Sequence, residues 1–137
     1  AGSCTLMVQA SMPVCVFARP PSSDGGGAAS AAGNSHRRVS ELELRGGTDA
    51  DMAPPVGYLS HVLVPLLKRL YGSLMDELDV HVVRRGFYPR GGGIITARIP
   101  SLPPGTPLPP LDLTSRGKIT QVTIVAFSAG RLPVKVA

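Results

Sequence analysis

The order of apolar and polar positions predicts two helices. Residues 3–18, SCTLMVQASMPVCVFA, are apolar on almost every side, which is typical of a buried helix with Ser3 as its N-cap. Gln9 is its one large polar side chain, and Pro13 predicts a kink. A second helix is predicted over residues 57–71, because apolar residues recur there with helical spacing on one face, although Pro65 interrupts it. This stripe consists of Leu59, Val62, Leu63, Leu66, Leu67 and Leu70.

Four shorter segments have the pattern of β-strands. Residues 41–45, ELELR, alternate strictly between polar and apolar. Residues 79–85 and 94–99 are predicted strands joined by the turn GFYPRGGG, and residues 119–127, ITQVTIVAF, are a last one. The order α–β–α–β–β–β favours an α/β protein of the two-layer α+β kind, with two helices packed on one face of a small mixed sheet.

Length and composition narrow this picture. A chain of 137 residues suffices for one domain with a single core. Residues 19–38 are of low complexity and are predicted to form a flexible loop, because they offer little apolar surface to offset ordering entropy. The formal net charge of +5 permits a polyanionic partner and is equally compatible with a mildly basic, solvated surface.

The two cysteines and the ends of the chain suggest where the protein works. Cys4 and Cys15 would lie roughly 16 Å apart along one helix, whereas a disulfide needs Cα atoms within about 7 Å, so reduced thiols and an intracellular protein are expected. The sequence shows neither a membrane-spanning apolar run nor the charged leader of a signal peptide. It begins without Met and stops in LPVKVA, which suggests a fragment.

The triple glycine Gly91–Gly93 has two interpretations. Phosphate-binding glycine loops deliver the phosphate to a helix N-terminus, but these glycines lead into a predicted strand. A tight hairpin or bulge that needs positive φ is therefore favoured. The alternative is a close backbone approach to a polyanion, helped by the neighbouring arginines Arg84, Arg85 and Arg90.

A second candidate region follows the strand at 41–45. Gly46–Thr48 lies past its carboxyl end, where ligands of open α/β sheets gather. The following MAPP, residues 52–55, is either one wall of a pocket for a flat ring or a proline-stiffened turn. Gln9 likewise either satisfies a neighbouring backbone group or reads the edge of a ligand.

No catalytic centre can be assembled from the sequence. His36 falls in the predicted loop, His61 on the polar face of a helix and His81 in a strand. No Cys/His spacing suits zinc, and no set of nucleophile, base and orienting group is present. The residues by themselves indicate a ligand-contacting domain.

Four motifs in order resemble the RNA 3′-terminal phosphate cyclase family. They are AGSCTLMVQASMPVCVFA, ELELRGGTDADMAPP, RRGFYPRGGG and AFSAGRLPVKVA. RGFYPRGGGII is similar to the family signature, and the resemblance covers nearly everything except residues 19–38, which look like an insertion. The resemblance implies a large domain of βαβαββ repeats, of which residues 1–137 would be the middle one, without its first strand and truncated before an inserted small domain.

The resemblance also implies an activity. Members of the family are ligases that use ATP to convert an RNA 3′-phosphate into a 2′,3′-cyclic phosphate. A histidine becomes adenylylated, AMP passes to the RNA phosphate, and the neighbouring 2′-hydroxyl closes the ring. ATP, an RNA 3′ end and a divalent metal, Mg²⁺ or Mn²⁺, are the implied cofactors and partners.

Only some of the family's functional residues fall within this chain. Gln9 and Pro54 match positions that contact ATP. The signature turn corresponds to Arg85, Gly86, Pro89, Gly91, Gly92 and Gly93. The catalytic histidine belongs to a later segment, so this chain is expected to hold no catalytic residue, no metal ligand and no activity of its own. Gly57 stands where the family is expected to have an acidic residue.

A non-catalytic alternative exists within the same fold. The cyclase-like ribosome-biogenesis factor acts in rRNA processing, and its version of the signature lacks the aromatic pair found here as Phe87–Tyr88. That pair and the ending AGRLPVKVA favour the cyclase. A nuclear location is expected from the loop insertion, with the cytoplasm as the alternative, and the oligomeric state is left open.

Overall fold

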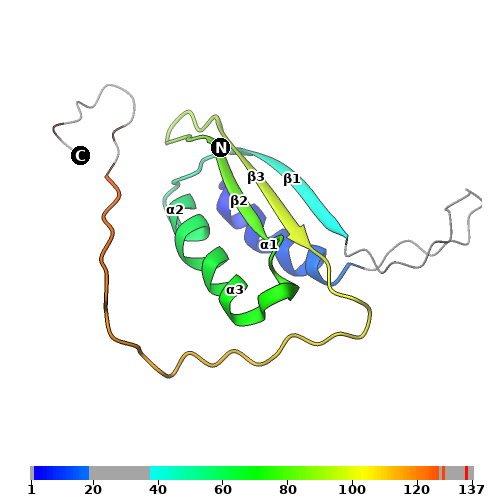
Figure 1. Cartoon of the computed structure of the whole chain (residues 1–137). Coiled ribbons are helices and arrows are strands. Elements are labelled where there is room, and N and C mark those ends of the chain that lie inside the picture. The colour runs from blue at the N-terminus through cyan, green and yellow to red at the C-terminus, as the bar shows by residue number, and fades with distance from the viewer. Residues whose placement is uncertain (1, 19–37, 127, 129–134, 136–137) are drawn as a thin grey trace, which may run out of the picture.

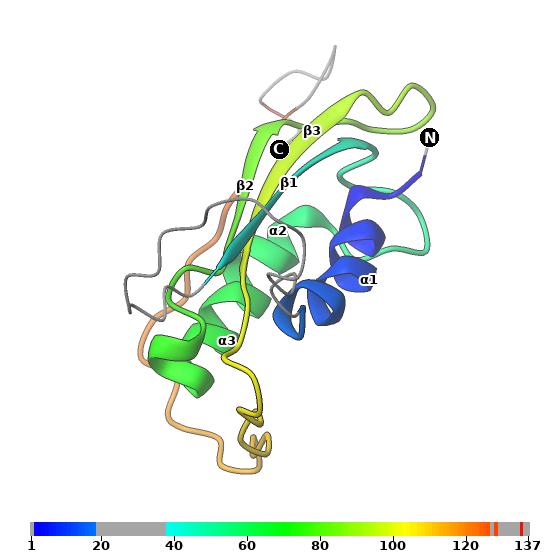
Figure 2. The same cartoon turned by 90° about the vertical axis from the view of Figure 1, so that its right-hand side faces the viewer.

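The computed structural model describes residues 2–18, 38–126, 128 and 135. In these residues three strands form one layer and the helices form the other, so the two-layer α+β fold is confirmed. Turning the molecule by 90° shows both helices on the same face of the sheet (Figure 2). The predicted loop at 19–38 lies outside the described residues, apart from Arg38.

The sheet has the strand order β1-β3-β2, with β1 at Val39–Gly46, β2 at Asp79–Arg84 and β3 at Gly93–Pro100. β3 pairs antiparallel with both neighbours. The expectation of a mixed sheet is therefore wrong for the described strands. β1 and β2 run in the same direction on either side of β3, and the helical segment between them crosses over one face.

The strand register separates a core face from an open face. Ala97 is paired with Leu42 in β1 and with Val80 in β2, and all three contribute to the core beneath the helices. The next residue along β3, Thr96, is paired with Glu43 and His81, which are both exposed. The strict alternation of the ELELR segment thus predicted its inward face correctly, because successive side chains of a strand point to opposite sides.

Helix α1, Cys4–Val16, packs on β1 and β3 but is not buried on all sides. Ser3 is its N-cap, with Oγ accepting a hydrogen bond from the Leu6 N–H at 3.3 Å. The buried stripe is narrow, and Val14 is 70% exposed. The prediction of a fully buried helix is wrong, because one sheet covers only one side of a helix. Its buried residues are Cys4, Thr5, Val8 and Val16.

The second helical segment runs without a break from Val56 to Tyr71, in three parts: α2 (Val56–Tyr58), a π-helical turn η1 (Leu59–Leu63) and α3 (Val64–Tyr71). Pro65 explains the wide turn, because it has no N–H and its ring would collide with the carbonyl four residues earlier. The Val64 N–H accordingly reaches back five residues to the Leu59 carbonyl. The turn also shifts the apolar stripe, so that Val62 is exposed while Val56 and Val64 are buried.

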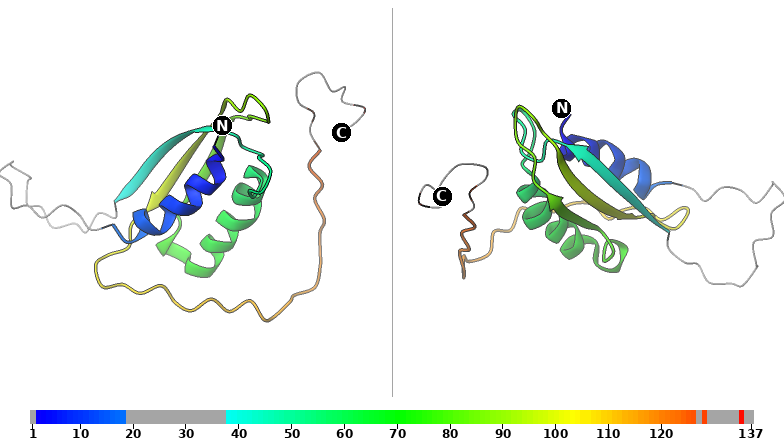
Figure 3. Two further views of the ribbon diagram at one scale, coloured as in Figure 1. Left: turned by 180° about the vertical axis from the view of Figure 1, so that it is seen from behind. Right: turned by 90° about the horizontal axis from the view of Figure 1, so that it is seen from above.

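The core lies between the sheet and the two helical segments. Figure 3 shows α1 and α3 from behind, lying next to each other over the strands. Burying a side chain of this size contributes roughly 1.5–3 kcal/mol, so a few large residues supply much of the driving force. The largest apolar ones that are fully buried are Leu59, Leu78, Ile95, Ile99, Val8 and Val56.

The strand predicted at residues 119–127 is not found. Residues 119–126 have no regular structure, and Phe127 lies outside the described residues. The apolar side chains of this segment are exposed, Ile124 to 86%. A strand needs a neighbour to satisfy its backbone, and this segment has none among the described strands. In the part of the chain that the structure describes, no helix is both long and apolar enough to span a bilayer.

Candidate functional site

The candidate site is a junction at one end of the sheet, where four segments meet: the start of α1, the end of β1, the end of β2 and the start of β3. The Cys4 N–H donates to the Gly47 carbonyl at 2.9 Å, and the Gly47 N–H donates to the Gly2 carbonyl at 2.9 Å. These two bonds fix the beginning of α1 against the carboxyl end of β1. The hairpin between β2 and β3 lies at this same end (Figure 1).

Thr48 joins the β1 end to the hairpin. Its N–H donates to the Gly86 carbonyl at 2.8 Å, and its Oγ1 accepts from the Gly86 N–H at 3.0 Å. The Thr48 hydroxyl lies 2.7 Å from Oδ2 of Asp49, to which it donates, and 3.2 Å from the Gly86 carbonyl. Thr48 is completely buried. Its N–H and hydroxyl groups are both hydrogen-bonded, as buried polar groups generally are.

An ion pair closes the same contact from outside. Nη1 of Arg85 lies 3.0 Å from Oδ2 and 3.3 Å from Oδ1 of Asp49. The side chains are 29% and 18% exposed, which makes this the least exposed ion pair in the described part of the chain. Nη1 of Arg85 contacts both carboxylate oxygens, so the guanidinium orients the Asp49 side chain as well as balancing its charge.

Glycine is required where these backbones touch. A Cβ on Gly86 would collide with the backbone of Gly93, and a Cβ on Gly93 would lie 2.6 Å from Cγ2 of Thr48. These two residues pack backbone against backbone, which no side chain permits. The signature glycines at positions 86 and 93 therefore serve the junction.

The hairpin turn needs two further glycines for another reason. Gly91 and Gly92 have φ of 63° and 71°, the left-handed region that glycine adopts without strain. The Gly91 N–H donates to the Phe87 carbonyl at 2.7 Å, and Nε of Arg84 donates to the Gly92 carbonyl at 2.8 Å. Pro89 follows a cis peptide bond. The chain continues into β3 and not into a helix, so this turn lacks the geometry of a helix-borne phosphate loop.

The loop that carries Pro54 begins at the junction. The Val56 N–H donates to the Thr48 carbonyl at 2.9 Å, which closes residues 49–55 into a compact loop before α2. Within it, Met52 has φ of 60° and a fully exposed side chain. Pro54 is half-buried. The position of Pro54 thus depends on Thr48, and through Thr48 on Gly86.

Gln9 lies in the second turn of α1, the helix that starts at the junction. Its side chain is exposed, and its amide has no hydrogen-bond partner among the described residues. Of the two interpretations of Gln9, a core amide satisfied by a neighbouring backbone group does not agree with this exposure. No hydrogen bond joins Gln9 to Pro54 in the described part of the chain, but both belong to segments whose first residues are fixed at one junction.

The remaining polar candidates do not form a catalytic or metal centre. His61 is exposed on η1 and His81 is exposed on β2, while His36 lies outside the described residues. Across the described ranges, no three His, Cys, Asp or Glu side chains are grouped as ligands for a metal ion. The two cysteines are free thiols, and burial raises the pKa of Cys4 above its usual value.

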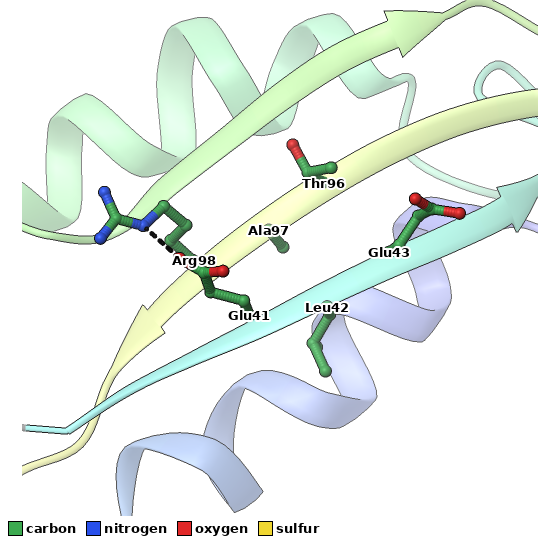
Figure 4. A pocket seen from close by; sticks show the side chains of 6 residues that line it. All are labelled: Glu41, Leu42, Glu43, Thr96, Ala97 and Arg98. Atoms are coloured by element: carbon green, nitrogen blue, oxygen red, sulfur yellow. Dashed lines mark hydrogen bonds and ion pairs between the residues drawn. The ribbon is translucent and has the colours of Figure 1, made fainter.

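A separate hollow lies on β1 and β3 (Figure 4). Nε of Arg98 donates to Oε1 of Glu41 at 3.2 Å across the strands, and Leu42 points to the opposite side, toward α1. Arg98 and Glu41 are mostly exposed to solvent, where such pairs contribute about 0–1 kcal/mol. The hollow therefore holds only a surface ion pair on the open face of the sheet, and none of its lining residues belongs to the junction.

Comparison with known proteins identifies the family. The model of the family "RNA 3′-terminal phosphate cyclase" matches residues 1–130. The chain belongs to this family. Among similar proteins, the RNA 3′-terminal phosphate cyclase of Drosophila melanogaster is 39% identical over all 137 residues, and that of Hyperthermus butylicus is 38% identical over the same length. The probable RNA 3′-terminal phosphate cyclase of Dictyostelium discoideum is 30% identical over 127 residues, 93% of the chain.

The chain spans only part of these relatives. It covers 31% of the length of the Drosophila and Hyperthermus cyclases and 24% of the Dictyostelium protein. Sequence reasoning had singled out the glycines of the cyclase signature and the Gly46–Thr48 segment, but it missed Asp49 and the contact of Thr48 with Gly86. The signal was present as a Thr-Asp pair directly after two glycines at a strand end, together with an arginine at the start of the later turn.

Proposed function

We propose that this chain is the nucleotide-contacting segment of an enzyme that converts an RNA 3′-terminal phosphate to a 2′,3′-cyclic phosphate at the expense of ATP. The observation that carries the proposal is the family match over residues 1–130, which includes the whole junction. Its chemistry is activation of a poor electrophile: AMP is transferred to the RNA phosphate, and the 2′-hydroxyl then displaces AMP.

Gln9 and Pro54 have separate roles in this proposal. The exposed amide of Gln9 offers a donor and an acceptor to a nucleotide edge, without first breaking a hydrogen bond within the described chain. Pro54 presents a rigid apolar ring for packing against the nucleotide. The Thr48–Gly86 and Asp49–Arg85 contacts hold the Pro54 loop in place.

Neither the nucleophile nor a metal is assigned to this chain. We infer that the adenylylated histidine belongs to a segment of the complete protein outside these residues, and that the chain alone is inactive. The divalent metal that the family implies does not fit the described residues, because they present no cluster of metal ligands.

A non-catalytic rRNA-processing factor of the same fold is the alternative. The aromatic pair Phe87–Tyr88 at the turn favours the cyclase, because that pair is the feature of the signature expected to separate the two classes. The two proposals differ in turnover, so activity is the deciding measurement.

A chimera tests the proposal. Residues 1–137 replace the matching segment of the Drosophila cyclase, and the product is assayed for transfer of label from ATP and for cyclisation of a 3′-phosphorylated RNA. The unmodified Drosophila protein is the positive control, and a melting curve shows whether the chimera folds. Cyclisation by the chimera supports the proposal. A folded chimera that binds RNA and forms no cyclic phosphate favours the non-catalytic alternative.

A further inference from the structure

The tip of the hairpin carries an aromatic ring that is not buried in the core. Tyr88 is 86% exposed, although the turn that presents it is closely held. Phe87 and Gly91 form an antiparallel β-bridge within the turn, and Nε of Arg84 donates a hydrogen bond to the Gly92 carbonyl. An exposed ring on a held turn loses little conformational freedom when a partner stacks on it.

The surroundings of Tyr88 are small and uncharged on one side. A shallow hollow adjoins the ring, lined by Gly47, Ala50, Tyr88, Pro89 and Gly91. Its walls are glycine backbone, a methyl group and proline. The hollow has a volume of about 40 Å³, which is smaller than a nucleobase, so a base would stack on the exposed Tyr88 ring beside it, as bases do on aromatic side chains irrespective of their identity.

The charge of the hairpin is of one sign. Residues 84–92 contain Arg84, Arg85 and Arg90 and no acidic residue. Arg90 is exposed and has no ion-pair partner among the described residues, whereas Arg85 is engaged with Asp49. The other acidic residue of the loop at 49–55, Asp51, is exposed.

We propose that the hairpin is a single-stranded RNA contact site, at which a base stacks on Tyr88 while Arg90 approaches the adjoining phosphate. An exposed aromatic ring two residues from an arginine without an ion-pair partner among the described residues matches a base and its phosphate. A peptide would need a row of unpaired backbone groups or a deeper apolar pocket. The inference rests on the proposed function for its choice of RNA as the polyanion.

Binding of a short, fluorescently labelled, 3′-phosphorylated single-stranded RNA to the full 137-residue chain tests the site without requiring turnover. Tyr88→Ala is expected to weaken binding roughly 5- to 150-fold, the range for losing one stacked base. Tyr88→Phe keeps the ring and should bind like the parent chain. Tyr58→Ala, which removes another exposed tyrosine, should also leave binding unchanged.

The phosphate contact has its own matched pair of variants. Arg90→Gln should reduce the steepness of the salt dependence of binding by roughly 0.7 in the logarithmic slope, the value for one phosphate of a single strand. Arg116→Gln removes the same charge from an exposed position outside the hairpin and should leave the slope unchanged. Equal effects of both arginine variants would mean that RNA binding depends only on the net charge of the chain, and this outcome would overturn the Arg90 assignment.

The remaining outcomes also decide. Equal affinity of Tyr88→Ala and the parent chain overturns the stacking site, as does a loss with Tyr88→Phe as large as that with Tyr88→Ala. If Tyr88→Ala weakens binding of ATP and leaves RNA binding intact, the base belongs to the nucleotide and the RNA site is wrong. Failure of the chimera to cyclise RNA, with the Tyr88 effect preserved, would remove the proposed function and leave the RNA contact standing.

Discussion

Arg85 and Asp49 form a paired contact across the junction, with Nη1 of Arg85 lying 3.0 Å from Oδ2 and 3.3 Å from Oδ1 of Asp49. The two residues are 36 positions apart in sequence and belong to different strand ends. This contact fixes the hairpin to the loop that carries Pro54. Together with the Thr48–Gly86 bonds, it links the signature turn to the proposed nucleotide contact.

Breaking this pair should destabilise the chain. Asp49→Asn removes the negative charge that faces the partly buried Arg85, so a loss of roughly 1.5–3 kcal/mol in the free energy of unfolding is expected. Glu41→Gln is the matched control, because its partner Arg98 is largely exposed and a loss of about 0–1 kcal/mol is expected there. Urea denaturation of both variants measures the difference, and equal losses would show that the junction pair contributes no more than a surface pair.

Gly93→Ala should be costly for steric reasons alone. The added methyl group would lie 2.6 Å from Cγ2 of Thr48 and 2.8 Å from the Gly46 carbonyl, and overpacking of this kind costs roughly 1–3 kcal/mol. Gly117→Ala is the control, because nothing lies within 4 Å of a Cβ at that position. Thermal melting of the two variants is the measurement, and a Gly93→Ala variant as stable as Gly117→Ala would contradict the close packing of the junction.

The two thiols should react at different rates. Burial raises the pKa of Cys4 above its ordinary value of 9.0, which keeps it protonated and unreactive near neutral pH. Cys15 is half-buried and should be alkylated first by iodoacetamide, as followed by mass spectrometry of peptides. The raised pKa also has a consequence for stability: the contribution of the neutral thiol is complete below pH 9.0 and is lost as the pH rises through the folded pKa. Faster labelling of Cys4 in the folded chain would contradict this assignment.

Gln9→Ala tests the proposed nucleotide contact in the Drosophila chimera. Because the Gln9 side chain is exposed, the melting temperature should hardly change. Loss of one hydrogen bond to a neutral ligand edge, worth about 0.5–1.5 kcal/mol, should raise the KM for ATP roughly 2- to 13-fold. Gln121→Ala, at another exposed amide, should alter neither quantity. A lower melting temperature with an unchanged KM would return Gln9 to a structural role.

The chain alone should form no adenylate. Incubation of the 137-residue chain with ATP labelled in the α-phosphate is expected to leave it unlabelled, while the unmodified Drosophila cyclase is the parallel sample. Acid-labile label on His36, His61 or His81 would place the nucleophile within this chain and overturn the proposal that it lies outside.

The sequence by itself determined the local elements of this protein, because helices and strands leave their own periodicities. The ELELR alternation predicted which face of β1 meets the core, and the apolar stripe after residue 56 predicted the second helix. Glycines 91 and 92 could be assigned to a turn with positive φ from their place between two strand patterns. Each of these inferences needs only neighbours in sequence.

What the tertiary structure alone decided depends on residues far apart in the chain. The ITQVTIVA segment has every local property of a strand and forms none among the described residues, because a strand exists only where a partner accepts its hydrogen bonds. The exposed side of α1 could not be predicted either, because a helix that is apolar on almost every side does not reveal how many neighbours cover it. Thr48 reaches Gly86 across 38 positions, and Asp49 reaches Arg85 across 36. Such pairs have no period in the sequence, because only the folded sheet brings their strand ends to one place.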